Sequence, residues 1–211
     1  MQCRLCEWAE GRLFHDDGRR YFQCTRCGLV FVDPETFLDG ARERAVYDQH
    51  QNSPEDPGYR RFLSRLFQPM ASQLTPGSRG LDFGSGPGPT LSVMFEEVGH
   101  TMSLFDPFYA PDSTVFDRQY DFITASEVVE HLFRPRMDLE RVWGCLQPGG
   151  VLGVMTKRVR DEAAFSRWHY KNDPTHVCFF GLETFGWLAS HWDAALDVVG
   201  DDVVLFEKRA P

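Results

Sequence analysis

Short apolar runs alternate with longer stretches of helical periodicity between residues 80 and 191. Strands are predicted at the short apolar runs, which are 80–83, 101–105, 122–125 and 151–156. Helices are predicted where apolar residues recur every three or four positions, at 90–98, 137–146 and 182–191. Strands that alternate with helices indicate parallel crossovers, so the pattern predicts a parallel sheet with helices on both faces.

Two further elements flank this alternation. The β-rich runs 195–199 and 203–208 are joined by Gly-Asp-Asp, which predicts a hairpin and hence an antiparallel pair at the end of the sheet. Upstream, apolar residues at steps of three and four predict an amphipathic helix over 59–74. Pro69 is expected to kink or split that helix.

The chain divides into three parts. Residues 1–33 hold four of the six cysteines and form a small module. Residues 34–58 contain three prolines and mixed charge, which is typical of a linker or a lid. Residues 59–211 are long enough to bury the core of one ordinary domain.

Charge and composition narrow the possible partners. A formal net charge of -9 gives no general attraction to phosphate backbones, which are bound mainly through Lys and Arg, so nucleic acid is disfavoured. No apolar run approaches the roughly 20 residues that span a bilayer. Residues 1–10 carry charges and two cysteines instead of an apolar signal core. We therefore expect a cytoplasmic protein without membrane contact, whose cysteines are thiols or metal ligands.

Residues 81–88, Leu-Asp-Phe-Gly-Ser-Gly-Pro-Gly, place a glycine-rich loop directly after a predicted strand. Glycines let the backbone pass close to a ligand that side chains would block. A nicotinamide-binding loop has the spacing Gly-x-Gly-x-x-Gly, whereas here one residue separates the second glycine from the third. The glycines alone do not separate nicotinamide from S-adenosylmethionine, so the flanking residues decide.

These flanks resemble class I S-adenosylmethionine-dependent methyltransferases. Residues 81–88 resemble motif I of the family, and Asp106 resembles its acidic ribose-binding residue. Residues 120–132 and 146–152 resemble its fourth-strand region and the turn before its fifth strand. The resemblance extends over residues 60–208 and implies an α/β fold. That fold is a Rossmann-like seven-stranded sheet, mostly parallel with a C-terminal antiparallel hairpin, here with a small N-terminal zinc ribbon added.

The resemblance also implies the cofactor and its contacts. S-adenosylmethionine would be the methyl donor and S-adenosylhomocysteine the product. A carboxylate can accept hydrogen bonds from both ribose hydroxyls at once, which suits Asp106. The residues placed around the cofactor are Asp82, Gly84, Ser85, Gly86, Gly88, Asp106, Pro107 and Glu127. The adenine amino group has no obvious acidic partner between residues 106 and 121 beyond Asp117.

Cys3-x-x-Cys6 and Cys24-x-x-Cys27 are separated by 17 residues, a spacing typical of a four-thiolate zinc site. Each Cys-x-x-Cys turn presents two sulfurs to one ion, and two turns complete a closed structural site. Zn²⁺ would supply folding energy that about 30 residues cannot obtain from core burial alone. The alternatives are unrelated buried thiols or redox-active dithiols. The two cysteines outside this module are expected to be ordinary buried thiols.

Candidate catalytic residues follow the predicted strands, because ligands of a parallel sheet bind beyond the carboxyl ends of its strands. Glu130-His131 resembles the Glu-His of quinone-type methyltransferases, and His176 lies in a stretch that resembles a recurrent one of the family. His131 and His176 are therefore candidate proton acceptors, with a purely structural role as the alternative. The aromatic and titratable segment 168–176 supplies the candidate substrate contacts Trp168, His169, Tyr170 and Asp173.

Two basic residues directly follow the predicted strand 151–156. Lys157 and Arg158 could pair with an anionic substrate, or they could form a solvated strand end. The sequence leaves both interpretations open.

The sequence thus predicts an S-adenosylmethionine-dependent methyltransferase that acts on a small molecule. The architecture resembles small-molecule methyltransferases with an N-terminal zinc ribbon, and also a ribosomal-RNA guanine methyltransferase type. One alternative is therefore an RNA or protein methyltransferase that uses the ribbon for recognition. Another is an inactive methyltransferase-fold binding or scaffold protein, against which the intact Asp82, Gly84, Gly86 and Asp106 argue.

Overall fold

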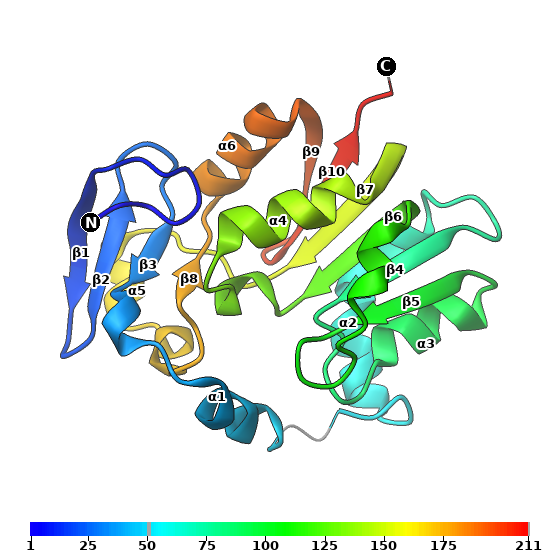
Figure 1. Ribbon diagram of the computed structural model, residues 1–211, viewed down its shortest axis with the longest axis horizontal. Coiled ribbons are helices and arrows are strands. Elements are labelled where there is room, and N and C mark those ends of the chain that lie inside the picture. The colour runs from blue at the N-terminus through cyan, green and yellow to red at the C-terminus, as the bar shows by residue number, and fades with distance from the viewer. Residues whose placement is uncertain (50–51, 211) are drawn as a thin grey trace.

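A computed structural model of the protein describes residues 1–49 and 52–210. Its central feature is a six-stranded sheet with the strand order β5-β4-β6-β7-β10-β9 (Figure 1). The strands are β4 (Arg79–Phe83), β5 (Thr101–Phe105), β6 (Tyr120–Ser126), β7 (Leu146–Met155), β9 (Ala194–Val199) and β10 (Val203–Lys208). Strands β4 to β7 are parallel, whereas β10 runs antiparallel to both β7 and β9. The α/β class, the mostly parallel sheet and its closing hairpin are therefore confirmed.

Within the described residues this sheet has six strands, where seven were expected. Residues 106–119 connect β5 to β6 through a bridge between Asp106 and Ala110 and the 3₁₀ helix Ser113–Asp117. A parallel crossover alone needs a dozen or more residues, so this connection has no room for a crossover and a further strand. Strand β5 is consequently an edge of the sheet.

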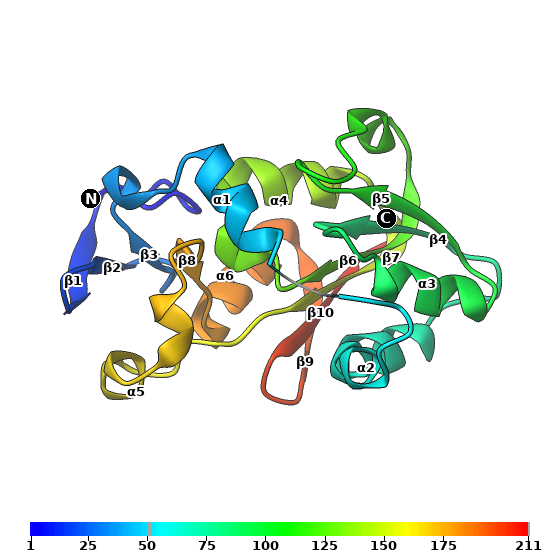
Figure 2. The same cartoon turned by 90° about the horizontal axis from the view of Figure 1, so that it is seen from below.

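Helices cover both faces of the six-stranded sheet (Figure 2). Helices α2 (Pro57–Ala71) and α3 (Thr90–Glu97) cover one face, and α4 (Pro135–Gly144) and α6 (Leu182–Trp192) cover the other. Each face of the sheet has its own hydrophobic core, and successive residues of β6 point into opposite ones. Phe122 packs with α2 and α3, and Ile123 packs with α4 and α6. Among the helices of the described residues, none is long and apolar enough to cross a membrane.

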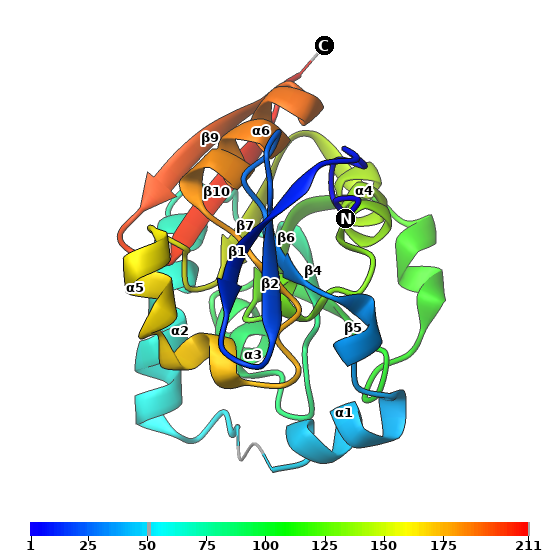
Figure 3. The same ribbon diagram turned by 90° about the vertical axis from the view of Figure 1, so that its left-hand side faces the viewer.

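A second, antiparallel sheet combines the first part of the chain with a strand from much later in it (Figure 3). Its strands, in spatial order, are β1 (Gly11–Asp16), β2 (Arg20–Cys24), β3 (Val30–Val32) and β8 (Cys178–Phe179). Val30 lies opposite Phe179, and Phe31 lies opposite Cys178. The buried side chains of this sheet belong to the same hydrophobic core as those of α4 and α6. Strand pairing and a shared core thus join residues 1–33 to the rest of the fold.

The segment expected to be a linker or a lid contains a helix. Asp39 caps the N-terminus of α1 (Gly40–Tyr47), because its side chain accepts a hydrogen bond from Arg42 N. At the other end of α1, Tyr109 Oη donates to Asp48 Oδ1 at 2.6 Å. Helix α1 therefore lies against the turn that follows β5.

Pro69 was expected to kink or split its helix, and the structure contradicts the split. The predicted helix 59–74 is the continuous helix α2, and Pro69 lies in its last turn. A proline inside a helix removes one backbone hydrogen bond and clashes with the preceding turn. Because only two helical residues follow Pro69, this disturbance coincides with the end of the helix.

Gly80 in β4 provides a test of the packing between neighbouring strands. A Cβ at Gly80 would lie 2.4 Å from Phe122 Cζ and 2.6 Å from Met102 Sδ. We expect Gly80→Ala to lower the free energy of unfolding by about 1–3 kcal/mol through overpacking. Gly186→Ala in α6 is the control, because among the described residues nothing lies within 4 Å of a Cβ there. Alanine should raise stability at that position by roughly 0.5–1 kcal/mol. Urea denaturation measures both variants, and equal stabilities would contradict this packing.

Candidate active site

The glycine-rich loop after β4 is fixed against the end of β5. The backbone N–H groups of Gly84 and Ser85 both donate to Phe105 O, at 2.7 and 3.1 Å. Gly84 has a φ of 78°, and a Cβ on it would lie 2.4 Å from Val128 Cγ2. Gly86 has a φ of 61°, but in the described part of the chain no heavy atom lies within 4 Å of a Cβ built there. The loop is therefore packed on one side and borders open space on the other.

Two more residues of this loop have distinct surroundings. Ser85 Oγ is buried and has no hydrogen-bond partner among the described residues. A Cβ on Gly88 would lie only 2.1 Å from Asn52 O, so the backbone that leads into α2 passes directly over the loop. This backbone therefore covers Gly88, whereas Gly86 borders open space.

Asp82 lies beneath the loop and holds its base. The side chain is buried, and its two oxygens accept hydrogen bonds from Thr124 Oγ1 at 2.7 Å and Ser92 Oγ at 3.0 Å. Burial raises the pKa of the Asp82 carboxyl, and the two hydroxyl donors counteract that rise. Asp82 was expected to contact the cofactor, but in the structure its polar contacts tie β4 to β6 and α3.

Asp106 connects the end of β5 to the glycine loop. Its Oδ2 accepts a hydrogen bond from Gly86 N at 3.0 Å, and its Oδ1 accepts from Phe108 N at 2.8 Å and Tyr109 N at 3.1 Å. The following residue, Pro107, is exposed at the start of the turn. An ionised carboxylate has about four lone-pair sites, so Asp106 retains acceptor capacity for a ligand beside Gly86.

Glu127 follows the last residue of β6 in an unusual backbone conformation. Its φ is 53°, a region that residues other than glycine seldom adopt and that is often found at functional sites. Its backbone N–H donates to Met155 O at 2.7 Å, which fixes it beside the end of β7. Burial and the charge of Glu130 raise the pKa of Glu127 to about 8, against the opposing effect of Lys157.

Glu130 and Tyr170 form a buried pair close to Glu127. Tyr170 Oη donates a short hydrogen bond to Glu130 Oε1 and lies 3.4 Å from Glu127 Oε2. Glu130 is fully buried, and its Oε2 has no hydrogen-bond partner among the described residues. Burial raises the pKa of Glu130 to about 7. The sequence pointed to Glu130 only as the neighbour of His131.

The two candidate histidines lie together, with ring centroids 4.7 Å apart. His176 Nδ1 is 2.7 Å from Tyr170 O, and His131 Nδ1 is 3.2 Å from Thr175 O. A carbonyl only accepts, so each Nδ1 carries the proton of its hydrogen bond. Burial and the charge of His131 lower the pKa of His176 to about 4, so His176 is neutral at pH 7.

The four candidate substrate contacts divide into two groups. Tyr170 is buried beside the two glutamates, and the half-buried Trp168 packs on it with ring centroids 4.9 Å apart. Asp173 Oδ1 accepts from the N–H and hydroxyl of Thr175, and its Oδ2 lies 3.8 Å from His176 Nε2. His169 is exposed and turns instead to Lys157, with Nε2 3.5 Å from Nζ. The structure brings Trp168, Tyr170 and Asp173 to the cluster and leaves His169 outside it.

Helix α1 adds two side chains to this region that sequence reasoning missed. Tyr47 Oη donates to Glu43 Oε1 at 2.8 Å, and its ring lies 5.4 Å from His131 and 5.8 Å from Phe108. Glu43 is buried, and burial raises the pKa of its carboxyl. The Asp-Gly start of α1 was the only sequence signal for this helix, because its polar composition is that of a loop.

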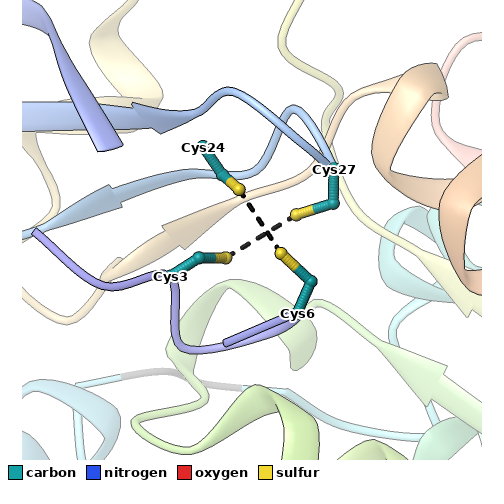
Figure 4. Close-up of side chains that lie close together, drawn as sticks. All are labelled: Cys3, Cys6, Cys24 and Cys27. Atoms are coloured by element: carbon teal, nitrogen blue, oxygen red, sulfur yellow. Dashed lines mark hydrogen bonds between the residues drawn. The ribbon is translucent and has the colours of Figure 1, made fainter. Parts of the chain in front are cut away.

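The four cysteines of residues 1–33 converge on one point (Figure 4). Their sulfur atoms all lie within 4.8 Å of one another, with Cys3 and Cys27 3.6 Å apart and Cys6 and Cys24 3.4 Å apart. A tetrahedral ion with Zn–S bonds of about 2.3 Å places its sulfurs about 3.8 Å apart. Backbone N–H groups two residues after Cys3 and Cys24 donate to their sulfurs at 3.4 Å. These side chains could hold a zinc ion.

Comparison with known proteins identifies the family of the larger part of the chain. A family model described as a methyltransferase domain matches residues 50–198. No curated protein sequence matches the chain.

Solved structures show the same fold at low sequence identity. One is the 1,6-didemethyltoxoflavin-N1-methyltransferase of Burkholderia thailandensis, solved with 1,6-didemethyltoxoflavin and S-adenosylhomocysteine. It has a TM-score of 0.55 and 14% identity, over 96% of this chain and 100% of that one. Another is a SAM-dependent methyltransferase of Archaeoglobus fulgidus, with a TM-score of 0.56 and 14% identity over 79% of this chain and 99% of that one.

The family match and the strand order agree with the glycine loop and acidic strand end found in the sequence. They confirm, at the level of family and fold, the prediction of an S-adenosylmethionine-dependent methyltransferase. The chain belongs to the methyltransferase domain family.

Proposed function

We propose that the protein transfers a methyl group from S-adenosylmethionine to a small-molecule acceptor. The observation that carries this proposal is the hydrogen bond from Gly86 N to Asp106 Oδ2, because it brings the glycine loop and the acidic end of β5 to one point. The similar fold of a methyltransferase solved with 1,6-didemethyltoxoflavin and S-adenosylhomocysteine supports it. When bound, S-adenosylmethionine supplies an activated methyl group, so the protein mainly has to align the two reactants.

In this proposal Asp106 accepts hydrogen bonds from the ribose hydroxyls while it keeps the bond from Gly86. The open side of Gly86 and the unpartnered Ser85 hydroxyl face the cofactor, and Gly88 and Pro107 border it. Asp82 supports the cofactor site indirectly: its hydrogen bonds with Thr124 and Ser92 fix the base of the glycine loop. Glu127, at the end of β6, accepts from the ammonium group of the cofactor.

On the acceptor side, we assign a positioning role to His176, because its Nδ1–H holds the backbone of Tyr170 and its pKa of about 4 makes it a weak base at neutral pH. His131 is less buried and keeps the role of candidate proton acceptor. Trp168, Tyr170 and Asp173 shape the acceptor site, with His169 at its outer edge. A base is required only where the acceptor must lose a proton.

For residues 34–58 we propose the role of a lid over the cofactor. Helix α1 reaches both halves of the site, since Tyr47 packs on His131 and Phe108 while Asp48 accepts from Tyr109. These contacts are aromatic and polar and lie at the surface or half-buried, so they can separate at modest cost. The lid would exclude water while the methyl group moves.

For residues 1–33 we propose a zinc ribbon, with Zn²⁺ bound structurally by Cys3, Cys6, Cys24 and Cys27. The support is the convergence of four buried sulfurs from two Cys-x-x-Cys turns. Four thiolates leave no open position for catalysis. Cys145 and Cys178 are also buried, as expected, but lie outside this cluster.

Binding of S-adenosylhomocysteine tests the cofactor site. We expect calorimetry to detect binding to the wild type, and Asp106→Asn to weaken it at least about tenfold, because hydrogen bonds to a charged acceptor contribute about 1.5–3 kcal/mol. Asp112→Asn is the control, since Asp112 is exposed in the same connection and caps only a 3₁₀ helix. No binding at millimolar ligand, or equal binding by both variants, would refute the proposal. Absence of binding would favour the scaffold alternative.

The alternative of an RNA or protein methyltransferase and the cytoplasmic location stay predictions.

The buried carboxyl of Glu130 predicts a pH dependence of stability. Its pKa is about 7 in the folded protein and near 4.3 in an unfolded chain, so the unfolded state loses its proton first as the pH rises. Stability therefore falls between about pH 4 and pH 7 by an amount on the order of 3 kcal/mol. Glu130→Gln removes this titration and keeps an acceptor for Tyr170. Urea denaturation at pH 5 and pH 8 should show wild type losing stability relative to the variant, and parallel curves would contradict the burial of a titrating carboxyl.

Metal analysis tests the ribbon. The purified protein should contain about one zinc per chain, and Cys24→Ser should release it and lower the melting temperature. Cys145→Ser is the control, because Cys145 is a buried thiol outside the cluster and should leave the zinc content unchanged. A wild type that is stably folded without metal, or a Cys24 variant that retains its zinc, would defeat the proposal.

A further inference from the structure

A cavity of about 350 Å³ lies next to the acceptor side of the proposed active site. Its walls come from α2, the segment after β7, α5 (Glu162–Ser166) and the turn between β9 and β10. The lining residues are Arg65, Lys157, Arg158, Arg160, Ala164, Phe165, Trp168, Asp201 and Asp202. A second cavity of about 280 Å³ shares Arg158, Arg160 and Asp201 with it.

The charges of this cavity do not cancel, because four cationic side chains face two carboxylates. Asp202 forms an ion pair with Arg65. Asp201 lies 3.8 Å from Arg160, but both of these side chains are more than two-thirds exposed, and such pairs contribute little. Among the described residues, Lys157 and Arg158 have no carboxylate partner within 4.0 Å. The cavity therefore carries a net positive charge.

Arg158 is held in place with unused hydrogen-bonding capacity. Its Nη2 donates to Gly200 O at 2.5 Å, which anchors the guanidinium to the turn between β9 and β10. Its Nη1 is buried and has no hydrogen-bond partner in the described chain. A buried donor without a partner is destabilising, so this guanidinium retains hydrogen-bonding capacity for an acceptor.

The cavity is adjacent to the reacting end of the proposed site. Lys157 Nζ lies 5.2 Å from the ring centroid of Tyr170, and the Tyr170 hydroxyl contacts Glu130 and Glu127. Burial and Glu130 raise the pKa of Glu127, and the charges of Lys157 and Arg65 oppose this rise. Trp168 lines the cavity and packs on Tyr170, so one aromatic wall continues from the cavity to the cluster.

We propose that the methyl acceptor is an anionic small molecule whose carboxylate or phosphate group binds Lys157 and Arg158 in this cavity. An apolar or aromatic part of the same molecule packs on Trp168, and the atom that receives the methyl group lies toward Tyr170 and Glu127. Ammonium and guanidinium groups make charge-assisted hydrogen bonds with either anion. The proposal rests on the proposed methyltransferase function and assigns the chemical class of its acceptor.

Binding of simple probes to the S-adenosylhomocysteine-saturated protein tests the proposal. Phenyl phosphate and benzoate supply the two anions on an aromatic ring, and benzyl alcohol is the uncharged control. Calorimetry should detect at least one of the anions and show at least tenfold weaker binding of benzyl alcohol. Affinity for the anion should fall at least fivefold in Arg158→Gln and in Lys157→Gln, and it should weaken as salt increases. Arg167→Gln, an exposed arginine beside α5 that does not line the cavity, should bind like wild type.

The outcomes separate the two proposals. A preference for phenyl phosphate assigns a phosphate acceptor, and a preference for benzoate assigns a carboxylate. If S-adenosylhomocysteine binds but benzyl alcohol binds as well as the anions, or if both Arg158→Gln and Lys157→Gln keep wild-type affinity, the acceptor class is overturned and the methyltransferase proposal stands. If S-adenosylhomocysteine does not bind the wild type, the proposed function itself fails. Two variants on different side chains keep the test valid if one of them does not fold.

Discussion

The short pairing between β3 and β8 determines where the second half of the site lies. Val30 and Phe31 face Phe179 and Cys178 across this pairing, which draws the chain after β7 away from the six-stranded sheet and into the second sheet. The residues on the way, 157–177, must therefore cross the carboxyl ends of β6 and β7. Along this path Tyr170 and His176 come close to Glu130. A sheet with its own hydrogen bonds thus positions side chains that a flexible loop would leave mobile.

Tyr170 marks a border between two electrostatic environments. On one side, burial raises the pKa of Glu130 to about 7 and lowers the pKa of His176 to about 4. On the other side, Lys157 and Arg158 line the cavity. Buried ionisable groups usually lose their charge when no partner compensates for the lost water. One tyrosine ring therefore lies between a buried cluster, where burial disfavours the charged forms, and a cavity lined mostly by basic side chains.

Much of the six-stranded sheet could be predicted from the sequence, because its strands and helices each carry a local period and its turns carry Gly, Pro or Asp. Asp106 and the glycine loop were found for the same reason, since each directly follows a strand. The two residues of β8 carry no period that distinguishes a strand, and their partners lie about 150 residues away. The roles of Asp82 and Glu130 depended on burial and on partners from other elements. Such long-range contacts have no local signal, so only the structure revealed them.

The left-handed backbone of Glu127 restricts which residues can replace it during evolution. Glycine, asparagine or aspartate would tolerate this conformation, whereas valine or isoleucine would force the end of β6 to move away from Met155. A relative with glycine there would keep the fold and lose the carboxyl group beside Tyr170. A relative with aspartate would keep a carboxyl group on a shorter side chain. The residue type at this one position therefore indicates whether a related chain has retained the carboxyl group of the site or only the scaffold around it.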